Sequence, residues 1–189
     1  MYSKKTLNRL KEAVKQIEDI EKMVKAKNGV NNLLEDELFG RKAVMKSFDI
    51  MAEQFEKIKN SDDSSLLAEP TIEKDYLGLK GIRNESSHNY FGVDFDIIKN
   101  TIENFLPNFK KNIQQILKEI KKELCKNLEK NVDYFTKKQD ILMPQAKTDL
   151  IKTIEKEYKK LKENNITLDK PYSDKIKNII KENSKENQK

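Results

Sequence analysis

The sequence contains few of the residues on which most chemical sites depend. Its 189 residues include one cysteine, one histidine, no tryptophan, five glycines and four prolines. A single cysteine, Cys125, cannot form an internal disulfide, so we interpret it as a packing residue in a reducing compartment. Zinc requires three or four histidine, cysteine or carboxylate ligands, and no glycine-rich phosphate loop is present. We therefore predict neither a metal site nor a cofactor.

Long hydrophobic runs are also absent. No stretch reaches the roughly 18 apolar residues that a membrane span needs. The first residues, Met1 to Lys5, lead directly into an amphipathic pattern rather than into the apolar centre of a signal peptide. We expect a cytoplasmic protein that does not associate with membranes.

Charged residues are abundant, at 37% against 36% hydrophobic residues, which is typical of long amphipathic helices. The net charge of +6 has a clear location. Residues 1–117 carry 19 basic and 19 acidic residues, whereas residues 118–189 carry 19 lysines and 13 acidic residues. This basic segment could attract RNA phosphates. Alternating lysine and glutamate are also typical of a solvated helix face, and this alternative stays open.

Apolar residues recur every three or four positions and predict an all-α protein. The expected helices span residues 4–26, 36–60 and 75–84, followed by a fourth from residue 95 to about 124 with a kink at Pro107. Ser3 and Asp94 are candidate N-caps, and Lys27-Asn28-Gly29 is a candidate terminator. Four helices with short connections indicate an up-and-down bundle.

The remaining residues predict a helical extension. We divide the chain into residues 1–124, the bundle, and residues 125–189, a lysine-rich segment. Pro144 and Pro171 should separate its helices. The end, from about Lys181, has almost no apolar content and is expected to be disordered.

The most informative stretch surrounds the only histidine. Arg83 is followed by four residues, then His88, one residue, and Tyr90. Arginine binds phosphate oxygens through two hydrogen bonds, and histidine transfers protons near neutral pH, so the pair suits phosphodiester chemistry. On one straight helix, however, Arg83 and His88 would lie about 140° apart. Either the helix breaks near Ser86-Ser87, or two copies of the chain combine their groups across a two-fold axis.

The motif and its flanks resemble the HEPN superfamily, and within it the HepT-like toxins that pair with a minimal nucleotidyltransferase antitoxin. Arginine, four residues, histidine, any residue and tyrosine form the family motif. The entry Gly81-Ile82-Arg83-Asn84, the segment from Tyr90 to Asp94 and the pair Leu106-Pro107 also fit. The resemblance covers roughly residues 5–118 and implies a four-helix HEPN bundle.

The resemblance implies a metal-independent endoribonuclease that acts as a homodimer. Arg83 and His88 would be catalytic, and Asn84 would bind phosphate or orient His88, although a structural role for Asn84 is as consistent. Glu53 occupies a helix where the family often has a glutamate supporting the arginine, but we favour a surface glutamate. Asp94 and Asp96 leave a magnesium site as an alternative to helix capping, which we prefer.

The resemblance also implies regulation at Tyr90. A cognate nucleotidyltransferase antitoxin would transfer AMP to this tyrosine and silence the toxin of a type VII-like system; a packed core tyrosine is the alternative.

Gly78 and Gly81 leave a smooth helix face that would admit a partner chain, or they merely weaken the helix. Two other functions stay open: a catalytically inactive scaffold that binds nucleotide or presents a substrate, and a structural helical dimer in which His88 is a core residue.

Overall fold

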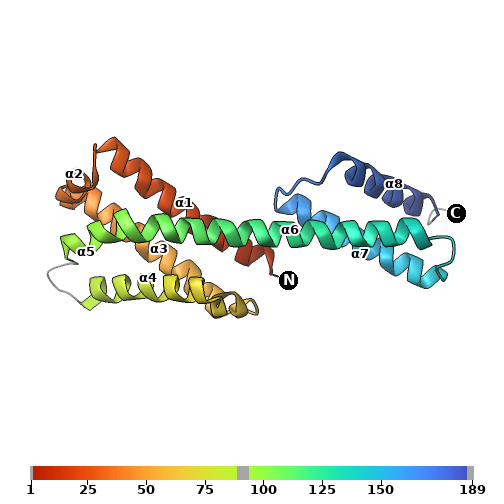
Figure 1. The fold of residues 1–189 in the computed structure, drawn as a ribbon, viewed down its shortest axis with the longest axis horizontal. Coiled ribbons are helices and arrows are strands. Elements are labelled where there is room, and N and C mark those ends of the chain that lie inside the picture. Colours follow the sequence, from red (N-terminus) through yellow and green to blue (C-terminus); the bar gives the residue numbers. More distant parts are fainter. Residues whose placement is uncertain (1, 89–93, 187–189) are drawn as a thin grey trace. The chain divides into compact units, whose positions relative to one another are not determined.

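A computed structural model describes residues 2–88 and 94–186. All elements in these ranges are helical, which confirms the all-α prediction. The chain forms two compact units, Met1–Leu117 and Lys118–Lys189 (Figure 1). The boundary between the units lies inside helix α6, Leu106–Lys138, as does the boundary that we predicted after residue 124.

The first unit begins with α1, a helix of 23 residues that spans Lys4–Ala26. Its bounds match the prediction. The side chain of Ser3 accepts a hydrogen bond from the Thr6 backbone N–H, and so caps the helix as expected. The terminator is also confirmed, because Asn28 and Gly29 adopt φ angles of 56° and 136°.

The segment after this terminator holds a helix that the sequence did not reveal, α2, Val30–Glu35. The expected helix 36–60 then consists of a π-helical turn, η1, Glu37–Arg41, and α3, Lys42–Lys59. Gly40 is required in η1, since a Cβ at this position would lie 2.0 Å from the carbonyl oxygen of Leu33. The tight junction between α2 and α3 therefore depends on glycine.

The polar connection after α3 has a structural role. Asp63 is nearly buried, and its Oδ2 accepts hydrogen bonds from the Ser3 backbone N–H at 2.8 Å and the Thr6 hydroxyl at 2.6 Å. Burial raises the pKa of Asp63, but these hydrogen bonds outweigh burial and leave the pKa below its usual value. The connection, which continues as the short helix η2, Ser64–Ala68, is thereby fixed to the start of α1.

The helix carrying the motif, α4, spans Pro70–His88 and is longer than the expected 75–84. Proline at the first helical position costs no hydrogen bond, and Ile72 is fully buried, so the first turn is stabilised by packing. Helix α3 contacts both α1 and α4. The buried side of α4 includes Ile72, Tyr76, Leu79 and Ile82.

The last helix of the bundle is assembled from three parts: α5, Phe95–Asn100; a π-helical turn η3, Thr101–Phe105; and α6. Asp94 caps α5, as predicted, by accepting a hydrogen bond from the Asp96 backbone N–H. The kink expected at Pro107 stays a prediction; Pro107 lies in the first turn of α6, and the π-helical turn η3 ends two residues before it. The core of the unit centres on large, fully buried side chains, among them Leu10, Ile17, Phe48, Phe55 and Phe109.

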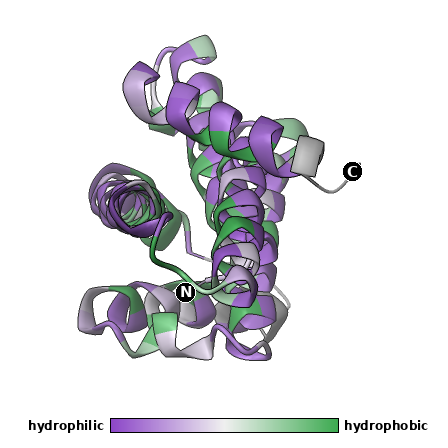
Figure 2. Cartoon of the chain, turned by 90° about the vertical axis from the view of Figure 1, so that its right-hand side faces the viewer, coloured by the Kyte–Doolittle hydropathy of each residue, from purple (hydrophilic) through white to green (hydrophobic). Residues whose placement is uncertain are grey.

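The second unit comprises the remainder of α6 with α7, Pro144–Glu163, and α8, Lys170–Glu186. Pro144 and Pro171 lie in the first turns of α7 and α8, so the predicted division is confirmed. We expected disorder from about Lys181, whereas the described residues stay helical through Glu186. Hydrophobic and hydrophilic residues are interspersed along the helices (Figure 2). Buried residues of this unit include Leu128, Val132, Ile154 and Ile176.

No helix within residues 2–88 and 94–186 combines the length and apolar character needed to cross a membrane.

Candidate functional site

Helix α4 positions the arginine of the motif. Arg83 is exposed, and it lies seven residues after Tyr76, a spacing that puts both residues on the same side of a helix. The two side chains are close enough for the charge of Arg83 to act on Tyr76. Burial and a hydrogen bond of 2.5 Å from the Tyr76 hydroxyl to Glu56 raise the pKa of Tyr76 to about 12, while the positive charge of Arg83 acts in the opposite direction. Arg83 therefore lies on the side of α4 that faces α3.

From the helical periodicity alone, Tyr76 is expected to be a packing residue, and nothing in the sequence singles out Glu56. The seven-residue spacing between Tyr76 and Arg83 was the available signal for the tyrosine. The contact with Glu56 spans 20 residues and depends on the packing of α3 against α4.

Glu53, on α3, is an exposed residue whose carboxylate pairs with Lys57 at 2.7 Å. Its pKa is lowered mainly by the hydrogen bond from Lys57, and Arg83 contributes a smaller attraction. The interpretation as a surface glutamate is thus the better one, although Glu53 and Arg83 are close enough to interact. The positive charge of Arg83 faces a carboxylate on the neighbouring helix.

The histidine of the motif belongs to the same helix as Arg83. Helix α4 continues without interruption through Ser86, Ser87 and His88. A break near Ser86-Ser87, the first of our two alternatives, is therefore wrong. An unbroken helix separates the Cα atoms of Arg83 and His88 by about 140° around its axis. One copy of α4 does not bring the two positions to one side.

The structure describes Asn84 but not Tyr90. Asn84 is exposed on α4. Tyr90 and Gly92, the expected modification site and turn residue, lie outside the described residues. The roles of Arg83, His88, Asn84 and Tyr90 therefore remain predictions.

A second side of α4 is open to solvent. Leu77, Gly81 and Asn84 succeed one another at intervals of four and three residues, and His88 follows four residues later, so these positions form one stripe on the helix. The side chain of Leu77 is 56% exposed. A Cβ added to Gly81 would have no neighbour within 4 Å. We call Leu77, Gly81 and Asn84 the α4 stripe.

The two glycines of α4 differ in their surroundings. A Cβ at Gly78 would lie 3.1 Å from the ring of Phe105, so η3 already packs closely against this glycine. Gly81 is the one of the pair that leaves room for a further chain.

Asp94 and Asp96 are the carboxylates considered for a magnesium site. Asp94 serves as the cap of α5. In the described part of the chain, no group of three or more histidine, cysteine or acidic residues is placed to hold a metal ion.

These features define an all-α bundle in which a long helix presents an arginine and a histidine motif. Comparison with protein families identifies the group. The model of the family "Ribonuclease HepT-like" matches residues 10–116, which include the arginine, the histidine and the α4 stripe. The chain belongs to the HepT-like ribonuclease family, and the resemblance to the HEPN superfamily is confirmed. No curated protein and no solved structure matches the chain.

Membership in a ribonuclease family indicates RNA as the substrate class. The family match ends at residue 116, close to the end of the first unit, and leaves the second unit without a counterpart.

Proposed function

We propose that the chain is the toxin of a type VII-like toxin–antitoxin pair, a metal-independent endoribonuclease that works as a homodimer. One observation carries the proposal: the family match covers a motif whose Arg83 and His88 lie on one unbroken helix. Their positions diverge by about 140° in a single chain, and a second chain related by a two-fold axis would supply the missing group on each side.

The reaction would use the ribose 2′-hydroxyl as nucleophile. A base removes its proton, the 2′-oxygen forms a bond to phosphorus, and the bond from phosphorus to the 5′-oxygen breaks. An acid returns a proton to the leaving 5′-oxygen. The products are a 2′,3′-cyclic phosphate and a 5′-hydroxyl. In the dimer, the two copies of His88 divide the roles of base and acid, which one histidine does not easily fill alone.

Arg83 would stabilise the charge that develops on the phosphorane. Its guanidinium is permanently charged and can donate two parallel hydrogen bonds to phosphate oxygens. Its exposure on α4 supports this role, because RNA must reach it from solvent. Asn84, on the adjacent stripe, would bind a phosphate oxygen or orient His88.

The α4 stripe supports a dimer interface beside the site. An exposed leucine gains free energy when a partner covers it. Gly81, which has open space above it, permits two helices to approach more closely than ordinary side chains allow. The stripe leads along the helix toward the position of His88. Two copies of α4 packed along their stripes would therefore bring both histidine positions near one interface.

Tyr90 would be the regulatory site. A nucleotidyltransferase partner would transfer AMP from ATP to the tyrosine hydroxyl, forming a phosphodiester and releasing pyrophosphate. The added group would carry negative charge two residues from His88. Electrostatic repulsion and bulk would then keep RNA phosphates out of the site.

The second candidate is a catalytically inactive scaffold. It would use the same Arg83 and His88 to bind a nucleotide phosphate, or would present a substrate to a nucleotidyltransferase. The exposed guanidinium is compatible with both functions, so cleavage is the property that separates them.

The test is to incubate the purified chain with transfer RNA and messenger RNA in EDTA and to identify the ends of all fragments. Cyclic-phosphate and 5′-hydroxyl ends that disappear in Arg83→Ala and His88→Ala support the nuclease. Lys80→Ala is the matched control, since it removes an exposed positive charge from the same helix one turn earlier. Intact RNA with a folded, unmodified dimer would refute the nuclease and favour the scaffold.

A further inference from the structure

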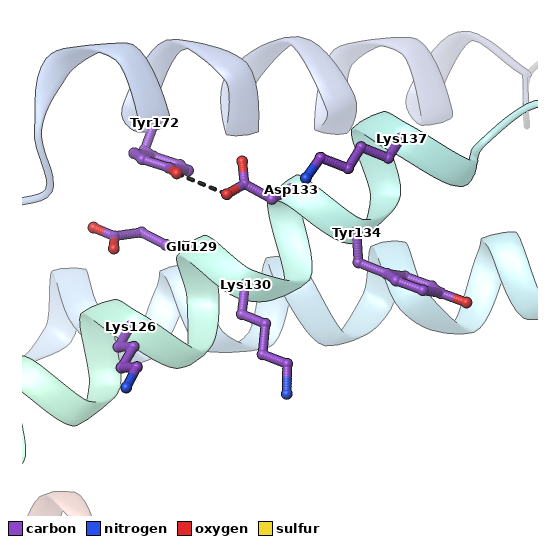
Figure 3. A pocket seen from close by; sticks show the side chains of 7 residues that line it. All are labelled: Lys126, Glu129, Lys130, Asp133, Tyr134, Lys137 and Tyr172. Carbon is purple, nitrogen blue, oxygen red and sulfur yellow. Dashed lines mark hydrogen bonds between the residues drawn. The ribbon is translucent and has the colours of Figure 1, made fainter.

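The second unit presents a face that combines lysines with an exposed aromatic ring. Lys126, Lys130 and Lys137 are exposed on α6, and Tyr134, between the last two, is 52% exposed. Together they line an open hollow of about 460 Å³ (Figure 3). We call these three lysines and Tyr134 the α6 lysine face. It lies beyond the residues that match the family.

The buried residues of α6 lie on the other side of the helix. Leu128, Val132 and Phe135 have almost no exposed surface. The α6 lysine face is therefore not the packing side of the helix. Lys126, Lys130 and Tyr134 point to the same side of α6, away from Tyr172 on α8 (Figure 3).

One of the two acidic residues at the hollow, Asp133, interacts with side chains of α8. Asp133 accepts a hydrogen bond of 2.9 Å from the Tyr172 hydroxyl and lies 3.8 Å from the Lys175 ammonium. Lys175 also lies over the ring of Tyr172, 5.1 Å from its centroid. The carboxylate of Asp133 thus already interacts with two side chains of α8. Glu129 is the other carboxylate at the hollow, and three lysines outnumber these two acids.

The lysines extend along α6 for a distance suited to a chain of phosphates. The twelve residues from Lys126 to Lys137 span about 16 Å of helix. Sequence-independent binding of single-stranded nucleic acids combines such positive surfaces with aromatic rings on which bases stack. The net charge of the protein is also concentrated in residues 118–189.

We propose that the α6 lysine face is a second RNA-binding surface, in which the lysines bind phosphates and Tyr134 stacks on a base. RNA is the favoured ligand because the exposed ring of Tyr134 lines the same hollow as the three lysines, and the same chain carries a ribonuclease family domain. To this extent the inference rests on the proposed function. RNA held by this surface stays at a high local concentration for the cleavage site of the same chain.

Binding is tested on the full chain carrying His88→Ala, so that RNA is not cleaved. The anisotropy of a fluorescein-labelled single-stranded RNA gives the Kd at 50 and 200 mM salt. The α6 variant changes Lys126, Lys130 and Lys137 to glutamine. The matched control changes three exposed lysines of α7 in the same unit, Lys152, Lys156 and Lys159, to glutamine. It removes the same number of positive charges.

The α6 variant should bind at least 10-fold more weakly at low salt, and the slope of log K against log salt should fall by about 2, the value for three lost phosphate contacts. The α7 control should retain binding within about 3-fold. Tyr134→Ala should weaken binding by roughly 5- to 150-fold, the range for one lost stacking contact, and Tyr134→Phe should preserve it. Circular dichroism confirms that each variant is folded.

Equal losses in the α6 and α7 variants would overturn the proposal, because attraction would then follow net charge alone. So would unchanged binding in the α6 variant. Anionic phosphatidylserine vesicles provide a further arm: a face that binds vesicles and not RNA is a membrane contact instead. If the parent chain cleaves RNA and the α6 changes leave binding unaltered, this inference fails and the nuclease stands. If the parent chain never cleaves RNA and the α6 changes weaken binding, the nuclease fails and this inference stands.

Discussion

Replacing Gly81 by alanine should have opposite effects on folding and on dimerisation. Within one chain, the added Cβ meets no atom within 4 Å. Alanine is a better helix former than glycine in a helix interior by about 1 kcal/mol. The monomer should therefore become more stable by about 1 kcal/mol, which corresponds to about 2–4 °C in Tm for a chain of this size.

The same methyl group should hinder the proposed interface. If two α4 stripes pack at Gly81, each copy adds a methyl group to a close contact between helices. Overpacking of this kind costs roughly 1–3 kcal/mol. The dimer Kd should rise by roughly 5- to 150-fold, and RNA cleavage should fall with it at protein concentrations near the new Kd.

The measurements are urea unfolding at low protein concentration and sedimentation velocity over a concentration series. Gly78→Ala is the matched control on the same helix. Its Cβ would lie 3.1 Å from the Phe105 ring, so the helix gain is offset by crowding and the increase in stability should be smaller. Because Gly78 is covered by η3, the dimer Kd should not change. A Gly81→Ala protein that is more stable and dimerises as strongly as the parent refutes the α4 stripe as the interface.

Three further perturbations test the interface and the fold. Leu77→Ala should weaken the dimer by roughly 30- to 150-fold, because covering a leucine that is 56% exposed contributes about 1–1.5 kcal/mol in each of two copies. The control is Leu38→Ala, which changes a leucine that is 68% exposed on η1. Sedimentation should show no effect of this control on the dimer. Asp63→Ala should destabilise the first unit by about 3 kcal/mol in urea unfolding, because it removes the acceptor of the Ser3 and Thr6 hydrogen bonds. Folding lowers the pKa of Asp63, so the stability that this carboxylate contributes is present above about pH 4 and is lost as the pH falls through the folded pKa. The variant should therefore lose less stability than the parent on acidification. Parallel curves of unfolding free energy against pH for the two proteins would contradict this assignment. Gly40→Ala should lower Tm by several degrees, because its Cβ would collide with the Leu33 carbonyl oxygen; an unchanged Tm would show that η1 relaxes without cost.

The helices themselves were largely readable from the sequence because they depend on local signals. Ser3, Asn28 with Gly29, Asp94 and Pro144 end or begin helices through hydrogen bonds and φ angles that their own side chains determine. The start of α4 was misplaced at residue 75 because the first turn has few apolar residues. Proline at the first position was the signal that would have corrected it.

Asp63 shows why other features were not predictable. It lies between two helices, and its acidic character would favour an exposed position. Its actual environment depends on Ser3 and Thr6, roughly sixty residues away in sequence. The contact between Tyr76 and Glu56 and the exposure of Leu77 likewise depend on how α3 and α4 pack.

By itself, the sequence determined the helical class, the concentration of positive charge in residues 118–189, and the Arg83, His88 and Tyr90 motif that places the chain in its family. These follow from composition, periodicity and residue identity, which are properties of the chain alone. Only the tertiary structure decided that α4 is unbroken through His88, that Asp63 is anchored to α1, and which sides of α4 and α6 remain exposed. Those outcomes depend on packing between distant segments, because burial and hydrogen-bond partners exist only once the helices have met.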